Sequence, residues 1–79
     1  MRIEEDITVL ASFGMPHRIK PISFTWSGRT IEVNEVTFIW KTKEGQKVLH
    51  HFSVTDGSTL FELTFDSISL LWEIESVVT

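Results

Sequence analysis

The stretch that decides the fold is Phe24-Thr25-Trp26-Ser27-Gly28-Arg29-Thr30-Ile31-Glu32-Val33. Large apolar residues alternate with polar ones before Ser27-Gly28, and a new alternation starts just after this pair. A period of two is typical of a strand that buries one face, and a Ser-Gly pair between two such runs is a turn signal. The stretch therefore predicts two strands joined by a tight turn.

The alternation changes phase shortly after this hairpin. The apolar residues Ile31 and Val33 are odd-numbered. The next apolar residues on the alternation are even-numbered, namely Val36, Phe38 and Trp40. A regular strand cannot change phase, because successive side chains point to opposite faces, so an extra residue or a bend is required. We predict a β-bulge or a barrel corner at Asn34-Glu35 within one long strand.

Similar alternating runs cover residues 6–13, 48–55, 61–66 and 72–78, and Asp56-Gly57 between two of them is a strong hairpin signal. Because Glu5 breaks the alternation, we expect the first strand to start near Asp6. Two helical alternatives stay open, one through Ile3 and Leu10 and one around Leu71. The sequence predicts a single all-β domain over residues 1–79, a small antiparallel meander of five or six strands forming a curled sheet or an SH3-like open barrel.

The alternating runs also predict which side chains are buried. The predicted core consists of Ile7, Val9, Phe24, Trp26, Ile31, Val33, Val36, Phe38, Trp40, Phe52, Val54, Phe61, Leu63, Phe65, Trp72 and Ile74. A chain of this size has a thin core, and aromatic packing is the compensation available to it, because cysteine is absent.

Composition and charge exclude several classes of function. The net charge of −4 opposes binding to nucleic acid or to anionic membranes as a whole-molecule effect. The acidic start at residues 4–6 does not fit a signal peptide, and no apolar run is long enough for a transmembrane helix. We therefore expect a soluble cytoplasmic protein with no membrane contact.

No motif indicates catalysis, a cofactor or a metal. The serines lie outside any Gly-x-Ser-x-Gly turn, and the glycines are isolated, one in each turn. His50 and His51 are adjacent on a predicted strand and point to opposite faces, so a metal site would require His17 with carboxylates from elsewhere. We predict no enzyme activity, no cofactor and no metal site.

Two sets of residues are candidates for binding. Apolar residues on nominally polar strand faces suggest a protein partner or a homodimer, and they are Leu10, Ile39, Leu49, Leu60 and Leu71. Basic residues in the first half of the chain offer a less favoured nucleic-acid surface, and they are Arg18, Lys20, Lys41, Lys43 and Lys47.

A longer pattern of aromatic and turn residues extends through most of the chain. It consists of Pro21, Phe24-x-Trp26-x-Gly28-Arg29, Val33, Val36, Trp40, Phe52-x-Val54, Asp56-Gly57, Phe61-Glu62-Leu63, Asp66 and Trp72. This pattern resembles an uncharacterised family of small bacterial domains, although Leu70-Leu71 stand where we expect glycine in that family's last turn. The resemblance implies an all-β fold and carries over no catalytic residue; some members lie beside or are fused to translesion-type DNA polymerases.

Together these observations predict a non-enzymatic bacterial domain that acts as a protein-interaction or assembly module. An auxiliary nucleic-acid-associated β-barrel domain is the alternative.

Overall fold

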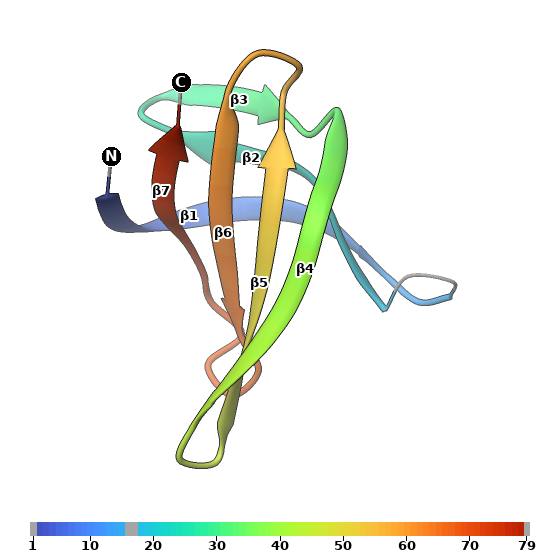
Figure 1. Cartoon of the computed structure of the whole chain (residues 1–79), viewed down its shortest axis with the longest axis vertical. Helices are drawn as coiled ribbons and strands as arrows, with labels where there is room; N and C mark the ends of the chain where they lie inside the picture. The colour runs from blue at the N-terminus through green and yellow to red at the C-terminus, as the bar shows by residue number, and fades with distance from the viewer. Residues whose placement is uncertain (1, 16–17, 79) are drawn as a thin grey trace.

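The computed structural model describes residues 2–15 and 18–78 and shows an all-β protein (Figure 1). Its seven strands are β1 (Arg2–Phe13), β2 (Ile19–Trp26), β3 (Arg29–Glu32), β4 (Glu35–Glu44), β5 (Lys47–Thr55), β6 (Leu60–Asp66) and β7 (Trp72–Val78). The predicted all-β antiparallel sheet is confirmed. Both helical alternatives are wrong, because the segments in question lie in β1 and in the turn leading to β7. No helix in the described residues is long and apolar enough to cross a membrane.

The strands form one curled antiparallel sheet in the order β3-β2-β1-β7-β6-β5-β4, which does not close into a barrel. The curl produces two layers, with β4 to β7 in front and β1 to β3 running crosswise behind them in Figure 1. β1 belongs to both layers, because its first half pairs with β7 up to Ile7 and its second half pairs with β2 from Thr8 onward.

The β2–β3 hairpin has the predicted form. Trp26 pairs with Arg29 across a two-residue turn, and Ser27 and Gly28 have φ values of 54° and 75°. Two consecutive positive φ values are typical of the type I′ turn, whose twist matches that of the flanking strands. This turn places Phe24 and Ile31 opposite each other, and both are buried.

The phase change predicted at Asn34-Glu35 is a corner between two strands rather than a bulge inside one. The backbone N–H of Val33 donates to the Ile22 carbonyl in the back layer (2.9 Å), and that of Asn34 donates to the Thr55 carbonyl in the front layer (2.8 Å). The corner splits the expected long strand into β3 and β4, which lie at opposite edges of the sheet. The described residues therefore form seven strands instead of the expected five or six.

The core lies between the two layers. Its buried members are Phe24, Ile31, Phe52, Val54, Phe61, Leu63, Phe65, Trp72, Ile74 and Val77. All of these except Val77 belong to the predicted core. Contacts between aromatic rings contribute to the packing, with ring centroids 5.2 Å apart for the edge-to-face pair Phe24 and Phe61 and 4.8 Å apart for the tilted pair Phe65 and Trp72.

Phe38 and Trp40 were predicted to be in the core, and this prediction is wrong. The register of β4 on β5 shifts between Val36 and Phe38, so Thr37 is an extra residue in β4. Beyond this bulge Phe38 and Trp40 point away from the core, and Phe38 is 64% exposed. The bulge turns Ile39 toward the core side, opposite Phe52.

A second irregularity explains the start of β1. This strand begins at Arg2, earlier than the expected start near Asp6, because the register shifts between Arg2 and Glu5. Glu4 has a φ of 55° at this bulge. Glu5 therefore breaks the alternation of the sequence without ending the strand.

Candidate functional site

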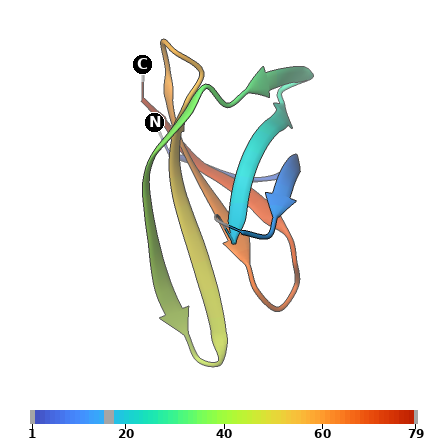
Figure 2. The same cartoon turned by 90° about the vertical axis from the view of Figure 1, so that its right-hand side faces the viewer.

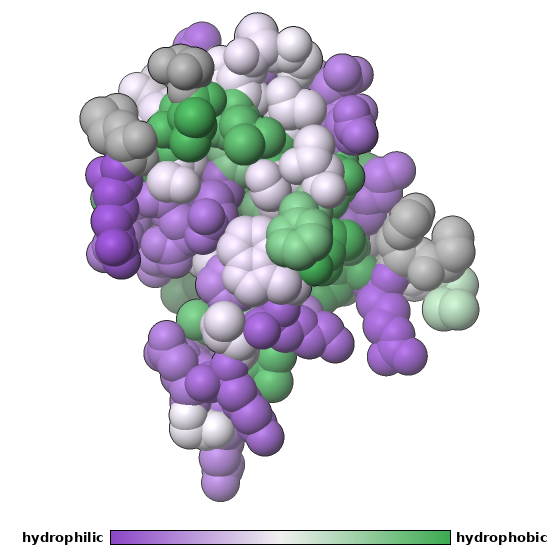
Figure 3. Space-filling model, in the orientation of Figure 1, coloured by the Kyte–Doolittle hydropathy of each residue, from purple (hydrophilic) through white to green (hydrophobic). Residues whose placement is uncertain are grey.

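The candidate site is the outer face of the front layer, which we define as the face of β4 to β7 and of the first half of β1 that is turned away from the core. The cross-strand register places one row of side chains over this face, in the order Trp40, His51, Thr64, Glu73 and Asp6. Figure 3 looks onto this face and shows mostly hydrophilic side chains around a central patch of hydrophobic and intermediate ones.

An aromatic cluster occupies the β4 end of this row. The ring of Trp40 stacks on His51, with centroids 4.9 Å apart and planes inclined by 9°, and Phe38 lies 5.4 Å from Trp40. Thr42 Oγ1 and His51 Nε2 are 2.7 Å apart, which fixes the imidazole under the indole. The cluster is held in position by two strands, yet it presents apolar rings to solvent.

The strand that carries these rings is also an open edge. Within residues 2–15 and 18–78, β4 pairs only with β5, so its other side leaves backbone N–H and C=O groups without ladder partners. Ile39 is 51% exposed on the core side of the same strand. Figure 2 shows the β4–β5 hairpin reaching beyond the other strands. A long edge strand with exposed apolar residues on both faces is a typical docking element.

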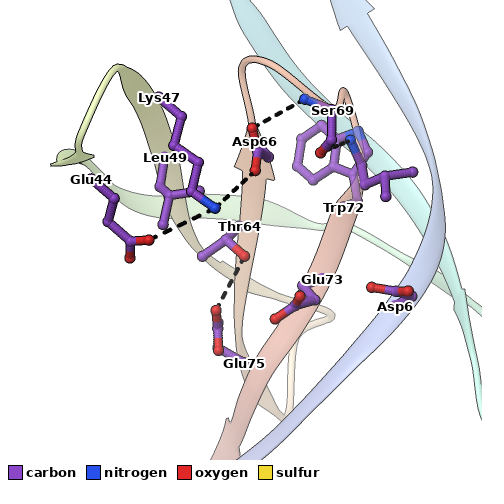
Figure 4. Close-up of a pocket in the computed structure, with 11 residues that line it drawn as sticks. Asp6, Glu44, Lys47, Leu49, Thr64, Asp66, Ser69, Trp72, Glu73 and Glu75 are labelled. Atoms are coloured by element: carbon purple, nitrogen blue, oxygen red, sulfur yellow. Dashed lines mark hydrogen bonds and ion pairs between the residues drawn. The ribbon is translucent and has the colours of Figure 1, made fainter.

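Farther from β4, the outer face is acidic around a depression of about 360 Å³ between β5, β6, β7 and the 67–71 loop (Figure 4). Lys47 Nζ lies 3.3 Å from Asp66 and 3.7 Å from Glu44, so this cation is already paired with carboxylates. Glu73 and Asp6 have no ion pair with any described residue, and Thr64 donates its hydroxyl hydrogen to Glu75 (3.3 Å).

The acids of this face influence one another. Partial burial raises the pKa of Glu73, and the neighbouring carboxylates of Glu75, Asp6 and Glu4 raise it further. The pKa of Asp66 is lowered instead, because the backbone N–H groups of Ile68 and Ser69 donate to it and Lys47 lies beside it. The negative charge of Asp66 is therefore compensated by close partners, whereas at Glu73 burial and the neighbouring acids outweigh the weaker attraction of Lys47.

The five apolar residues predicted to bind a partner do not form one surface. Leu49 and Leu71 both line the acidic depression, but Leu60 lies at the other end of β6, paired with Thr55 and Val78. Leu10 is exposed in the back layer opposite Ser23, and Ile39 lies on the core side of β4. The structure thus brings only two of the five together.

The predicted basic surface is divided as well. Lys41 and Lys43 pair with His50 and Val48 and lie on the core side of the β4–β5 hairpin, whereas Lys47 lies on the outer side with its carboxylate partners. Lys20 pairs with Ser12 in the back layer, and Arg18 precedes β2. These five residues form no common groove in the described parts of the chain.

No group of three or more His, Asp or Glu side chains in the described residues has the geometry of a metal site. His50 and His51 lie on opposite faces of β5 as predicted, with His50 on the core side next to Phe65. Burial lowers the pKa of His50, and the positive charge of Lys41 adds to this effect. His17, which a metal site would have required, lies outside the described residues.

The sequence pattern did not predict that Phe38 and Trp40 lie on the outer face, because their alternation with Val36 suggested a common buried face. One signal was available: Ile39 interrupts the polar side of the strand, which gives three consecutive large apolar residues at 38–40. Such a run does not fit a strand with one buried face. The acids from the two ends of the chain lie together only because β1 pairs with β7, and the sequence pattern did not predict this pairing.

Comparison with known proteins found no matching family model, no similar curated protein and no similar solved structure.

Proposed function

We propose that this protein is a non-enzymatic protein-interaction module that binds its partner through the exposed edge of β4. One observation carries the proposal: Phe38 and Ile39 are 64% and 51% exposed on an edge strand that no other described segment covers. Large apolar side chains clustered on a rigid strand with one open edge are typical of a partner site.

The supporting geometry is a pre-formed docking element. Trp40 is held by its stack on His51, and Phe38 lies against Trp40, so little side-chain freedom is lost when a partner covers them. The open edge of β4 adds backbone groups that an extended partner segment can pair with. A second copy of the chain is one such partner.

The nucleic-acid alternative has weaker support. Lys47 is paired with two carboxylates, and the exposed aromatic rings share their face with acids that repel phosphate. The resemblance to the bacterial family remains a prediction. The absence of cysteine fits a reducing compartment, and we place the module in the cytoplasm.

The proposal can be tested with peptides selected against the protein from a random phage-displayed library. We expect selected peptides to bind saturably and to lose affinity by roughly tenfold or more in Phe38→Ser, because a central aromatic anchor dominates such interfaces. Leu10→Ser removes an equally exposed apolar residue in the back layer and serves as the matched control.

Sedimentation of the same variants over a concentration series tests self-association. A dimer that is lost in Phe38→Ser and kept in Leu10→Ser supports the proposal with a second copy as the partner. The proposal fails if the protein is monomeric and no peptide is selected, or if both variants bind peptides as well as the wild type does.

A further inference from the structure

We propose that the partner segment is basic, rich in arginine, and lies across the strands of the outer face from Trp40 toward Asp6. This inference rests on the proposed function, because it uses the same aromatic cluster as one end of the site. It adds the chemical class of the partner and the path of the segment, which crosses the strands of the outer face instead of pairing along the edge of β4.

Charge complementarity is the first argument. The residues of the outer face include many more carboxylates than cations. The carboxylates belong to Asp6, Glu44, Glu62, Asp66, Glu73 and Glu75. The cations are Lys47, paired with Asp66 and Glu44, and Arg2, paired with Glu4. The face is left with a surplus of negative charge, and it favours a cationic ligand.

The outer face also holds a carboxylate that forms no ion pair with the described residues. This residue is Glu73, which lies at the acidic end of the row, between Thr64 and Asp6 in the register. Its pKa is raised by partial burial and by the surrounding carboxylates. A guanidinium placed at this point would relieve the repulsion and gain hydrogen bonds to carboxylates.

The length of the row sets the length of the segment. Trp40 and Asp6 are separated by four strand spacings, which amounts to about 19 Å at about 4.8 Å for each spacing. An extended chain of about six residues covers this distance at about 3.3 Å for each residue. A short linear segment of a partner protein therefore suffices to contact both the rings and the acids.

The aromatic end favours arginine over lysine. A guanidinium binds to the face of an indole and at the same time donates hydrogen bonds in its plane, whereas an ammonium is more strongly hydrated. Trp40 is half-buried and lies two strand spacings from Thr64, with His51 between them. Arginine side chains on one edge of the segment can contact both Trp40 and the carboxylates.

The test uses a blocked hexapeptide in which arginine alternates with threonine, titrated into the 15N-labelled protein. We expect saturable shifts of the Trp40 indole and Glu73 amide signals, weaker binding of the lysine version, and no binding of the glutamate version. Glu73→Lys should weaken binding of the arginine peptide by about 3- to 10-fold, as expected for reversal of a partly exposed charge.

Glu32→Lys is the matched control, because Glu32 is an exposed carboxylate in the back layer and its reversal changes the net charge equally. Equal weakening by the two reversals would overturn the inference, since it would show attraction to net charge alone. A second outcome is that the protein binds selected neutral or acidic peptides but not the arginine peptide, and that Phe38→Ser weakens this binding. This outcome would overturn the basic partner and leave the proposed function intact. Failure of every peptide class, together with a monomeric protein in sedimentation, would overturn both.

Discussion

At the scale of single residues, the 67–71 turn between β6 and β7 shows how local chemistry holds the loop that borders the acidic depression. Asp66 Oδ1 accepts hydrogen bonds from the backbone N–H groups of Ile68 and Ser69, at 2.8 and 3.2 Å. The Leu70 backbone N–H donates to the Asp66 carbonyl (2.9 Å). Asp66 thus closes the turn and anchors Lys47, so one side chain links the loop to the β4–β5 hairpin.

Leu70 is the strained residue of this turn. Its φ is 62°, a left-handed conformation in which a Cβ atom costs about 1–2 kcal/mol, and its side chain is 65% exposed. We expect Leu70→Gly to raise the free energy of unfolding by about 0.5–1 kcal/mol, since glycine removes the strain but gains entropy in the unfolded chain. Urea unfolding measures this change.

Leu71→Gly is the control for this prediction, because Leu71 is equally exposed but does not have a positive φ. We expect this substitution to destabilise the protein slightly. A loss of stability in Leu70→Gly as large as that in Leu71→Gly would show that the turn is not strained at Leu70.

At the scale of elements, the bulge at Thr37 decides which side chains of β4 are available for binding. Without the extra residue, Phe38 and Trp40 would share the face of Val36 and lie in the core. With it, they become the exposed part of an edge strand. A local irregularity of one residue therefore converts two predicted core aromatics into the centre of the proposed interaction surface.

Two phenylalanines on neighbouring strands test this assignment. Phe52 is 1% exposed, and Phe52→Ala should cost roughly 3–5 kcal/mol of unfolding free energy through the cavity it leaves. Phe38→Ala should cost less than about 1 kcal/mol, because its ring is largely exposed already.

Chemical denaturation of both variants gives the comparison. If Phe52→Ala does not fold, the milder Phe52→Leu replaces it and should still destabilise more than Phe38→Ala. Equal losses at the two positions would mean that Phe38 belongs to the core and that β4 has no bulge.

At the scale of the whole molecule, the curl of the sheet brings the acids of β1 next to those of β7. Asp6 and Glu73 are far apart in the sequence but pair directly in the register. Their mutual repulsion destabilises the free protein, and a basic partner would remove this repulsion. Binding sites often reduce the stability of a protein in this way.

This cost predicts a pH-dependent effect of Glu73→Gln. Because the folded-state pKa of Glu73 is raised, its contribution to stability is fully present below the unfolded pKa and is lost as the pH rises through the folded pKa. Relative to the wild type, Glu73→Gln should therefore be more stable at neutral pH, with the advantage disappearing below about pH 4.

Thermal unfolding at several pH values measures this difference, and added salt should reduce it. Glu32→Gln in the back layer is the control and should show a smaller change. An advantage of Glu73→Gln that does not depend on pH would contradict the electrostatic explanation.

The sequence by itself determined the all-β class, the β2–β3 hairpin and most of the core, because these follow from alternation with a period of two and from local turn chemistry. Phe24, Phe52, Leu63 and Ile74 could be placed in the core for this reason. The tertiary structure decided the position of Phe38 and Trp40, since a bulge depends on the register with a partner strand and leaves only a weak mark in the chain's own pattern. It also decided that acids from the two ends of the chain lie together on the outer face, because only the β1–β7 pairing places Asp6 beside Glu73.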